Sequence, residues 1–334
     1  MASLPEMTPM ASLLEMRGIC KSFPGVRALA DVDLTLQRGE VLGIVGENGA
    51  GKSTLMKILA GSFPADEGRV LLDGVPFTPR RPRDALDAGI VVIHQELSLV
   101  PDQTVAENIF IGHLPRNVLG MVQRGRLNRE SRALLARVGL SIPPQTNVRY
   151  LGIAQQQLVE IARALSREAR VIVMDEPTAT LTIAEQRILY ATVATLKQAG
   201  IGIVFISHHL EEIFEICDRV TVMRDGLTVE TRPTAAWDED SLIQAMVNRP
   251  ITALFPPRTS AIGPVLLEVE GLGSPGKFAQ VSLSVRAGEV VGLGGLMGAG
   301  RTEVLKAIYG ALPDVSGAIR IAGKPVRILS LIHI

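Results

Sequence analysis

The sequence is poor in cysteine, and its charges balance. Its only cysteines, Cys20 and Cys217, are too few for a disulfide framework and too far apart for a CxxC redox or zinc site. The 334 residues carry 34 Lys and Arg against 34 Asp and Glu, so no net charge attracts nucleic acid, and we expect no nucleic-acid partner. Cys217 shares helical spacing with Ile213 and Phe214, which predicts a core position on a helix.

Long hydrophobic runs are also missing. Apolar stretches such as 89–93 and 171–174 are far shorter than the roughly 20 residues that span a bilayer, which excludes a membrane-crossing helix. Residues 1–12 lack the basic and apolar regions of a secretory signal and are predicted to form a flexible tail. With 47% hydrophobic and 20% charged residues, the composition is typical of a folded cytosolic protein.

The chain repeats itself at an offset of 249 residues, from Gly39 to Gly288. Four further glycine pairs keep this offset: Gly51 and Gly300, Gly61 and Gly310, Gly68 and Gly317, Gly74 and Gly323. We expect a complete first domain at 13–247, a linker rich in Pro, Ser and Thr at 248–264, and the start of a second domain at 265–334. This predicts an incomplete tandem with a premature C-terminus, since a full one would have about 500 residues.

A glycine-rich loop follows the apolar run Val41–Val45. Residues 46–54 read GENGAGKST and lead into apolar residues at helical spacing, which predicts a strand, a phosphate-binding loop and a helix. In this pattern Lys52 contacts the β- and γ-phosphates and Ser53 holds Mg²⁺. The predicted nucleotide-binding residues of the loop are Gly46, Asn48, Gly49, Gly51, Lys52, Ser53 and Thr54.

Two further apolar runs of strand type end in polar side chains. The run 171–174 leads into Asp175 and Glu176, an acid to orient Mg²⁺ and a neighbour that could polarise an attacking water. The run 201–206 is followed by Ser207 and His208, which places an imidazole after a third strand. Because parallel strands deliver such groups to one edge of a sheet, we predict that they form one site.

Between these motifs lie Gln95 and the segment 151–155, and the whole order resembles that of the ABC ATPases over 13–247. The resemblance implies an α/β P-loop NTPase fold with a RecA-like mixed sheet, an antiparallel β subdomain and a helical subdomain at about 100–166. It also implies that Gln95 senses Mg²⁺ and the γ-phosphate, that Glu176 is the catalytic base and that His208 is the switch histidine. The signature loop would comprise Leu151, Gly152, Ile153, Ala154 and Gln155.

Two more roles follow from the same resemblance. The ring of Phe23 would stack on adenine, and Asp175 would join Ser53 and Gln95 in holding Mg²⁺. The cofactors implied are ATP and Mg²⁺.

Within this group, HQEL at 94–97 and TVAENIFIG at 104–112 look like the ATP-binding subunits of bacterial monosaccharide importers of the ribose, galactose or xylose type. The resemblance implies an ATPase peripheral to the cytoplasmic side of the inner membrane. It would energise sugar import through integral-membrane permease subunits, with a periplasmic sugar-binding protein in the complex. Thr104 and Glu107 also match a capping box, which predicts a helix start.

The sequence departs from the family pattern at two motifs. Gly152 stands where the family has Ser, and Arg301 stands in the second loop where Lys52 stands in the first. This degenerate second loop comprises Gly295, Gly298, Gly300, Arg301 and Thr302. In the family, the loop of one copy faces the signature of the other, so we expect one competent site and one degenerate site.

The sequence up to Ile334 has no second signature segment. We therefore expect ATP binding with little hydrolysis by this chain alone, except where a homodimer brings a signature loop to the Lys52 loop. Two other functions stay open. A soluble ABC ATPase of the ribosome or DNA shares these motifs but usually carries basic arms or coiled-coil insertions. A truncated ATP-binding module without turnover would differ in a hydrolysis assay.

Overall fold

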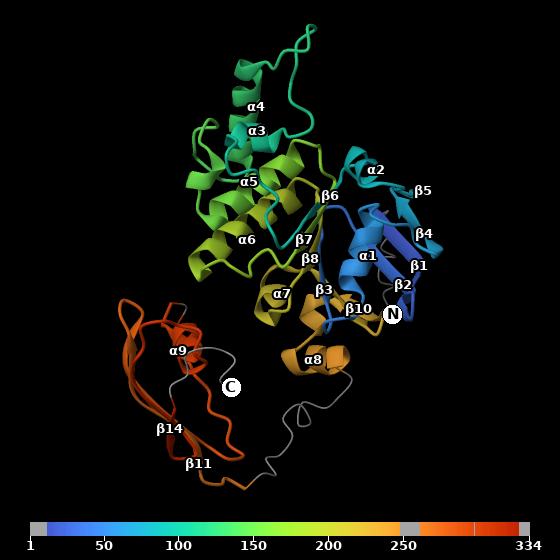
Figure 1. Ribbon diagram of the computed structural model, residues 1–334. Helices are drawn as coiled ribbons and strands as arrows, with labels where there is room; N and C mark the ends of the chain where they lie inside the picture. The colour runs from blue at the N-terminus through green and yellow to red at the C-terminus, as the bar shows by residue number, and fades with distance from the viewer. Residues whose placement is uncertain (1–11, 248–260, 297, 327–334) are drawn as a thin grey trace. The chain divides into compact units, whose positions relative to one another are not determined.

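A computed structural model describes residues 12–247, 261–296 and 298–326, which fall into two compact units, 1–254 and 255–334 (Figure 1). Each unit is described by itself. The predicted tail lies almost wholly outside the described residues, as do most of the predicted linker and the last eight residues. Among the residues described, no helix has the length and apolar content needed to cross a bilayer.

The first unit is built on a six-stranded sheet in the order β10-β9-β3-β8-β7-β6. All neighbouring pairs are parallel except β9 and β10, which are antiparallel. The strands are β3 (Val41–Val45), β6 (Ile90–Ile93), β7 (Val171–Asp175), β8 (Gly202–Ile206), β9 (Arg219–Arg224) and β10 (Leu227–Pro233). The three strands predicted to carry the site are therefore neighbours, in the order β3-β8-β7.

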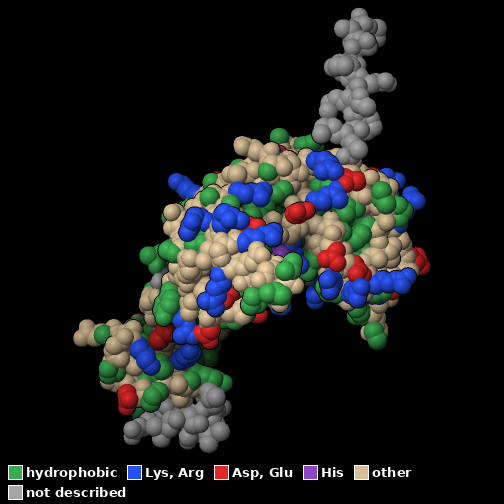
Figure 2. All heavy atoms as spheres, turned by 90° about the horizontal axis from the view of Figure 1, so that it is seen from above, with side chains coloured by type: hydrophobic (Ala, Val, Ile, Leu, Met, Phe, Trp, Pro, Cys, Tyr) green, Lys and Arg blue, Asp and Glu red, His purple; other side chains and the backbone are tan. Residues whose placement is uncertain are grey.

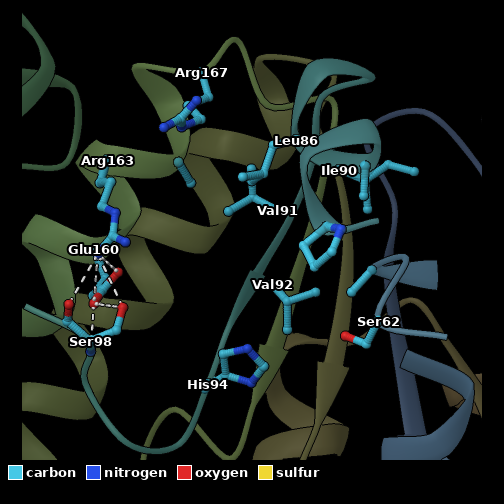
Figure 3. Close-up of a pocket in the computed structure, with 14 residues that line it drawn as sticks. Ser62, Leu86, Ile90, Val91, Val92, His94, Ser98, Glu160, Arg163 and Arg167 are labelled. Carbon is cyan, nitrogen blue, oxygen red and sulfur yellow. Dashed lines mark hydrogen bonds and ion pairs between the residues drawn. The ribbon is translucent and has the colours of Figure 1, made fainter. Parts of the chain in front are cut away.

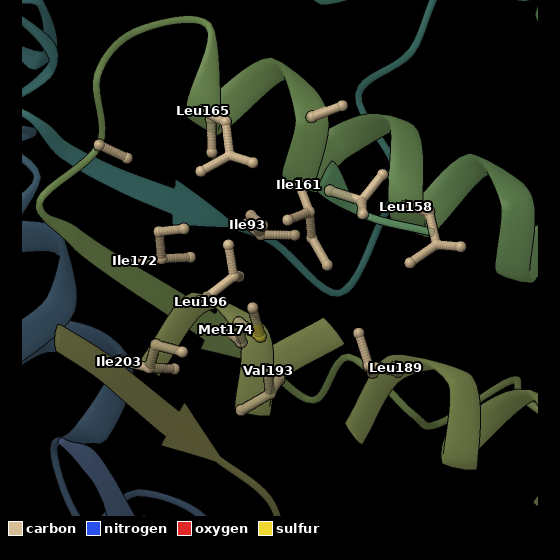
Figure 4. Close-up of a cluster of buried hydrophobic side chains, with 14 of the residues drawn as sticks. Ile93, Leu158, Ile161, Leu165, Ile172, Met174, Leu189, Val193, Leu196 and Ile203 are labelled. Carbon is tan, nitrogen blue, oxygen red and sulfur yellow. The ribbon is translucent and has the colours of Figure 1, made fainter. Parts of the chain in front are cut away.

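The central strands are apolar on both faces because each face is covered. In β7, Ile172 and Met174 point into one core while Val171 and Val173 point into the other. Figure 4 shows the first core, where strand residues meet the apolar faces of α5 (Ile153–Leu165) and α6 (Ile183–Gln198).

The opposite core lies under α1 (Lys52–Leu59) and a four-stranded antiparallel sheet in the order β2-β1-β4-β5. Its strands are β1 (Leu14–Phe23), β2 (Val26–Leu36), β4 (Glu67–Leu72) and β5 (Val75–Pro76). Leu14 pairs with Leu36 on one side and with Leu72 on the other. The mixed sheet and the antiparallel sheet are both present, as predicted.

The remaining helices of the first unit are shorter. They are α2 (Pro82–Asp87), α3 (Val105–Ile109), α4 (Arg124–Arg137), α7 (Leu210–Ile216) and α8 (Glu239–Val247), with 3₁₀ turns at Val148–Tyr150 and Thr234–Ala236. The predicted capping box at the start of α3 is confirmed, since Thr104 and Glu107 exchange side-chain to backbone hydrogen bonds.

The prediction that Cys217 lies on a helix is wrong by one residue. α7 ends at Ile216, and Cys217 has extended backbone angles because the chain turns there into β9. Its side chain is nevertheless buried in the predicted core, and burial raises the pKa of this thiol.

The second unit repeats the antiparallel sheet of the first. Its order β12-β11-β13-β14 matches β2-β1-β4-β5, and a helix, α9 (Arg301–Ile308), stands where α1 stands. The strands are β11 (Val265–Ser274), β12 (Phe278–Arg286), β13 (Ser316–Ile321) and β14 (Lys324–Val326). Paired glycines share left-handed angles, with φ of 99° and 80° at Gly51 and Gly300. The sequence repeat is thus a repeat of backbone conformation.

One element of the repeat is not formed. Residues 290–294, the counterpart of β3, have no assigned secondary structure, and Val290 is 88% exposed. In the first unit, β3 is paired on both sides, by β8 and β9. No strand within 261–296 and 298–326 takes either place.

We expect Gly68→Ala to destabilise the first unit by about 3 kcal/mol. Gly68 has φ of 96°, and a Cβ there would lie 2.4 Å from the carbonyl oxygen of Gly18, which is backbone and cannot swing away. Gly74→Ala is the matched control, because Gly74 also has positive φ, 75°, but open space around it, so only about 1 kcal/mol should be lost. Equal losses in chemical denaturation would contradict this packing argument.

Candidate functional site

The glycine-rich loop joins β3 to α1 and depends on glycine at its ends. A Cβ at Gly46 would lie 2.1 Å from the carbonyl oxygen of Met223, and one at Gly51 would lie 2.6 Å from the Leu29 side chain. Gly51 is left-handed and no side chain caps α1, so the first backbone N–H groups of the helix are free to bind an anion. The local sequence thus produces the expected strand, loop and helix.

This loop lines a cavity of about 460 Å³. Lys52 donates hydrogen bonds through Nζ to the carbonyl oxygens of Gly46 (2.6 Å) and Glu47 (3.1 Å). The lining residues are Val26, Arg27, Ala28, Asn48, Gly49, Ala50, Gly51, Lys52, Ser53, Thr54, Asp175, Glu176, Ile206, Asp225 and Gly226. The phosphate-binding loop and the acidic pair Asp175 and Glu176 therefore line one cavity, in line with the prediction that they lie at one edge of the sheet.

The charged groups of the cavity perturb one another. Burial, followed by the charge of Glu176, raises the pKa of the Asp175 carboxyl, while the Lys52 ammonium opposes this shift. Burial lowers the pKa of Lys52, against the attraction of Glu176 and Asp175. Both shifts come first from removing a charge from water, so burial in the cavity wall disfavours the ionised form of each group.

Glu176 lies directly after β7 in a strained conformation. Its φ is 48°, and its backbone N–H donates to the carbonyl oxygen of Ile206 at the end of β8 (2.9 Å). His208 Nδ1 lies 3.1 Å from Glu176 Oε1, so the imidazole and the acid are in contact. His208 is not itself among the cavity-lining residues and reaches the site through Glu176.

A buried carboxylate behind the site holds two of its loops together. Glu212 Oε2, on α7, accepts hydrogen bonds from Thr178 Oγ1 (2.8 Å) and Ser207 Oγ (2.7 Å). Ser207 Oγ in turn accepts from the backbone N–H of His209 (3.0 Å). The segment after the acidic pair and the segment bearing His208 are therefore positioned by one side chain, which sequence reasoning did not single out.

Sequence reasoning also missed two stretches of the cavity wall. Residues Val26–Ala28 open β2, while Asp225 and Gly226 form the turn between β9 and β10. The backbone N–H of Gly226 donates to the Ala50 carbonyl (3.2 Å) and ties this turn to the loop. The Asp-Gly pair is a local turn signal. Its place beside the phosphate loop follows only from long-range strand pairing.

Besides Gly46 and His208, which do not line this cavity, three further predicted groups lie outside it. Gln95 follows β6 and is exposed, and Phe23 packs its ring edge-on against Phe63, with centroids 5.4 Å apart. The predicted signature residues begin α5, where Gln155 Oε1 accepts from the Gly152 N–H (3.2 Å). A Cβ at Gly152 would meet nothing within 4 Å, so a Ser would fit there.

The second loop copies the backbone of the first. Gly295, Gly298 and Gly300 have φ of 156°, 83° and 80°, against 154°, 89° and 99° at the corresponding positions of the first loop. Arg301 and Thr302 begin α9 and are exposed, whereas Lys52 is half-buried. The acidic strand end and imidazole that accompany the first loop have no counterparts within the described part of this unit.

A groove with both apolar and charged walls lies between α2, β6 and α5 (Figure 3). It encloses about 320 Å³, with Leu86 and Val91 among its apolar residues and Arg163 and Arg167 opposite. Glu160 Oε1 accepts from the backbone N–H and the hydroxyl of Ser98 (2.9 and 3.0 Å), and Arg163 lies 3.3 Å from its Oε2. The groove therefore offers an apolar strip beside fixed charges.

We expect Asp175→Asn to raise the melting temperature at pH 7 by about 2–4 °C. The pKa of this carboxyl is raised in the fold, so ionisation at neutral pH costs stability that Asn does not lose. As pH falls through the raised pKa, the native carboxyl becomes neutral and the two melting temperatures should converge. Asp225→Asn is the control, since this acid at the same cavity is 88% exposed. A lower melting temperature for Asp175→Asn at pH 7 would refute the desolvation argument.

The chain matches known proteins along both units. A family model described as ABC transporter matches residues 29–179 and 278–333, and the two matches begin at the offset of the glycine repeat. A ribose import ATP-binding protein of Streptomyces coelicolor is 52% identical over 315 residues, which are 94% of this chain and 60% of that protein. A putative ribose/galactose/methyl galactoside import ATP-binding protein of Burkholderia lata is 48% identical over 316 residues, 95% of this chain and 60% of that protein. The chain spans about 60% of the length of these curated relatives.

Solved structures support the fold. An ATP-binding cassette of an ABC transporter in its ADP conformation superposes with a TM-score of 0.62 at 27% identity, covering 71% of this chain and 99% of that one. A nucleotide-free cassette gives 0.60 at 29% identity, covering 72% and 96%. Since the family model matches more than half of its residues, the chain belongs to the ABC transporter family, and its first unit has the α/β P-loop fold of that family's ATP-binding cassettes.

Proposed function

We propose that the chain binds ATP with Mg²⁺ in the cavity of the first unit, and that this site hydrolyses ATP to drive transport. One observation carries the proposal: the glycine-rich loop before α1, Lys52, and the paired acids Asp175 and Glu176 line the same cavity. The loop's N–H groups and the Lys52 ammonium would bind the β- and γ-phosphates. Lys52 would exchange its two carbonyl partners for phosphate oxygens.

The donor set suits Mg²⁺. Ser53 and Asp175 place a hydroxyl and a carboxylate oxygen in the cavity, and hard oxygen ligands are what this ion prefers. Gln95, which follows the strand beside β7, would add an amide oxygen. Bound Mg²⁺ would neutralise negative charge on the phosphate oxygens.

Glu176 is the proposed general base. Its carboxylate reaches the cavity while His208 holds its other side, so Glu176 can take a proton from a water directed at the γ-phosphorus. His208 keeps the acid oriented, and Glu212 positions the segment that carries His208. The signature loop at 151–155 would complete the site of a second copy, either in a homodimer or in a composite of two domains. In such a composite, Gly152 would face the loop bearing Arg301, and both departures would fall in one degenerate site.

The names of the relatives extend this proposal to sugar import. Those names specify import of ribose or of ribose, galactose and methyl galactoside. By that analogy, we propose a subunit peripheral to the cytoplasmic side of a bacterial inner membrane, working with permease subunits and a periplasmic sugar-binding protein. The groove of Figure 3 would receive a helix of the permease, because its apolar strip and flanking arginines suit an amphipathic helix with acidic residues.

Two measurements test this function. Titration with a fluorescent ATP analogue should give saturable binding that EDTA weakens at least tenfold, and absence of binding would refute the nucleotide site.

Co-purification with a sugar permease should be lost in Leu86→Asp, in the groove, and kept in Ile183→Asp, a 74% exposed position on α6. Retention of RNA or DNA instead of a permease would refute the transport role.

A further inference from the structure

An ordered hairpin with an apolar tip projects from the helical part of the first unit. Residues 115–123 are the last part of the connection between α3 and α4, and Figure 1 shows this connection reaching away from the body of the unit. Arg116 and Val122 form an antiparallel bridge, and the Asn117 N–H donates to the carbonyl oxygen of Met121 (2.9 Å). Asn117 Oδ1 accepts from the N–H groups of Leu119 and Met121, both at 3.0 Å. Backbone and side-chain hydrogen bonds therefore hold the tip in a defined turn.

The tip presents its large apolar side chains to solvent. Val118 is 103% exposed, Leu119 77%, Met121 59% and Val122 40%. Single exposed apolar residues need no explanation, but four within five residues on a hydrogen-bonded turn do. Four side chains cannot by themselves cover the roughly 800 Å² per partner that a stable protein interface buries. A projecting apolar tip of this size is better suited to insertion into a lipid surface than to a protein interface.

The charge around the tip has one sign. Residues 112–129 contain four arginines and no Asp or Glu, although the whole chain is neutral. Arg116, Arg124 and Arg126 flank the hairpin and are exposed. The first acid after the tip, Glu130, is paired with Arg126 (2.6 Å). Figure 2 views the molecule from the end where the hairpin lies in Figure 1, and on the face as a whole blue, red and green side chains are interspersed.

We infer that the 115–123 hairpin contacts lipid, with Val118, Leu119 and Met121 entering the acyl boundary of an anionic bilayer and the flanking arginines meeting lipid phosphates. An apolar tip within a basic collar is the chemistry of interfacial membrane anchors, and anionic leaflets attract such collars. The inference rests on the proposed function in one respect: a subunit docked on a permease lies beside the bilayer. In Figure 1 the hairpin and α2, which lines the groove, lie toward the same end of the first unit.

Vesicle sedimentation of the full 334-residue chain tests this inference. Vesicles of phosphatidylcholine with roughly 40% phosphatidylglycerol should bind the chain at least tenfold more strongly than phosphatidylcholine alone, and high salt should remove the difference. Leu119→Asp with Val118→Asp should lower binding about tenfold or more. Replacing Arg116, Arg124 and Arg126 by Gln should remove the preference for anionic lipid.

Val75→Asp is the matched control, because Val75 is 64% exposed on a different hairpin, where it begins β5, and its replacement should leave vesicle binding unchanged. ATP-analogue binding in the same samples shows that each variant is folded and keeps the two proposals apart, since vesicle binding needs no nucleotide. The inference is overturned if the unmodified chain binds neither vesicle, binds both equally, or loses as much binding in Val75→Asp as in the tip variant. Loss of permease co-purification in the tip variant, without vesicle binding by the unmodified chain, would assign the hairpin to a protein partner instead.

Discussion

Lys52→Ala should weaken ATP binding at least tenfold, a loss of about 1.4 kcal/mol or more. The ammonium is half-buried, and its two backbone acceptors, the carbonyls of Gly46 and Glu47, place it at the cavity wall. Removing it takes away the cation nearest the proposed phosphate position and leaves Asp175 and Glu176 to repel the nucleotide. Titration with a fluorescent ATP analogue measures the change directly.

Arg301→Ala is the matched control for that variant. Arg301 begins α9 after a loop with the same backbone as the first, but it is exposed and the described part of its unit supplies no acidic strand end. ATP affinity should therefore stay within twofold of the unmodified chain. Equal losses in the two variants would show that both loops bind nucleotide and would refute the proposed asymmetry.

Glu176→Gln should lower ATP turnover by about 100-fold to 1,000-fold while ATP binding is kept or becomes tighter. Gln has the shape of Glu and can still contact His208, but it cannot accept the proton of the attacking water. It also removes a negative charge that would lie close to the γ-phosphate. The measurement is phosphate release per chain at saturating ATP, made at protein concentrations that favour the homodimer, alongside ATP affinity in the same preparation.

Glu211→Gln tests whether any acid near this edge has the same effect. Glu211 is exposed on α7, next to the buried Glu212, and its replacement should change turnover less than twofold. A comparable fall in both variants would mean that general electrostatics, rather than proton transfer at Glu176, sets the rate. If Glu176→Gln instead abolished ATP binding, the acid would have a binding role.

Much of the site could be predicted because its signals are local. Apolar periodicity and glycine spacing predict the strand, loop and helix around Lys52. In the same way, polar residues that follow short apolar runs predict the strand ends at Asp175 and His208. The sheet order β3-β8-β7 confirms that these strands are neighbours. The functional roles of these residues stay predictions until the variants are measured.

Other parts of the site carry no local signal. Asp225 and Gly226 read as an ordinary turn, and only the pairing of β9 beside β3 brings them to the phosphate loop. Glu212 reads as one acid among several on α7, and its burial between Thr178 and Ser207 depends on how three segments pack. The sequence also gives no sign that the apolar residues of the 115–123 hairpin are exposed, because large apolar residues are usually expected to be buried.

By itself the sequence determined the repeat, the phosphate loop and the left-handed glycines, because each depends on neighbouring residues and backbone sterics. The tertiary structure decided which apolar segments actually form strands. Residues 41–45 and 290–294 are both apolar and both precede a glycine loop, yet only the first forms a strand. A central parallel strand needs hydrogen-bond partners on both sides, and β3 obtains them from β8 and β9, which come more than 150 residues later in the chain.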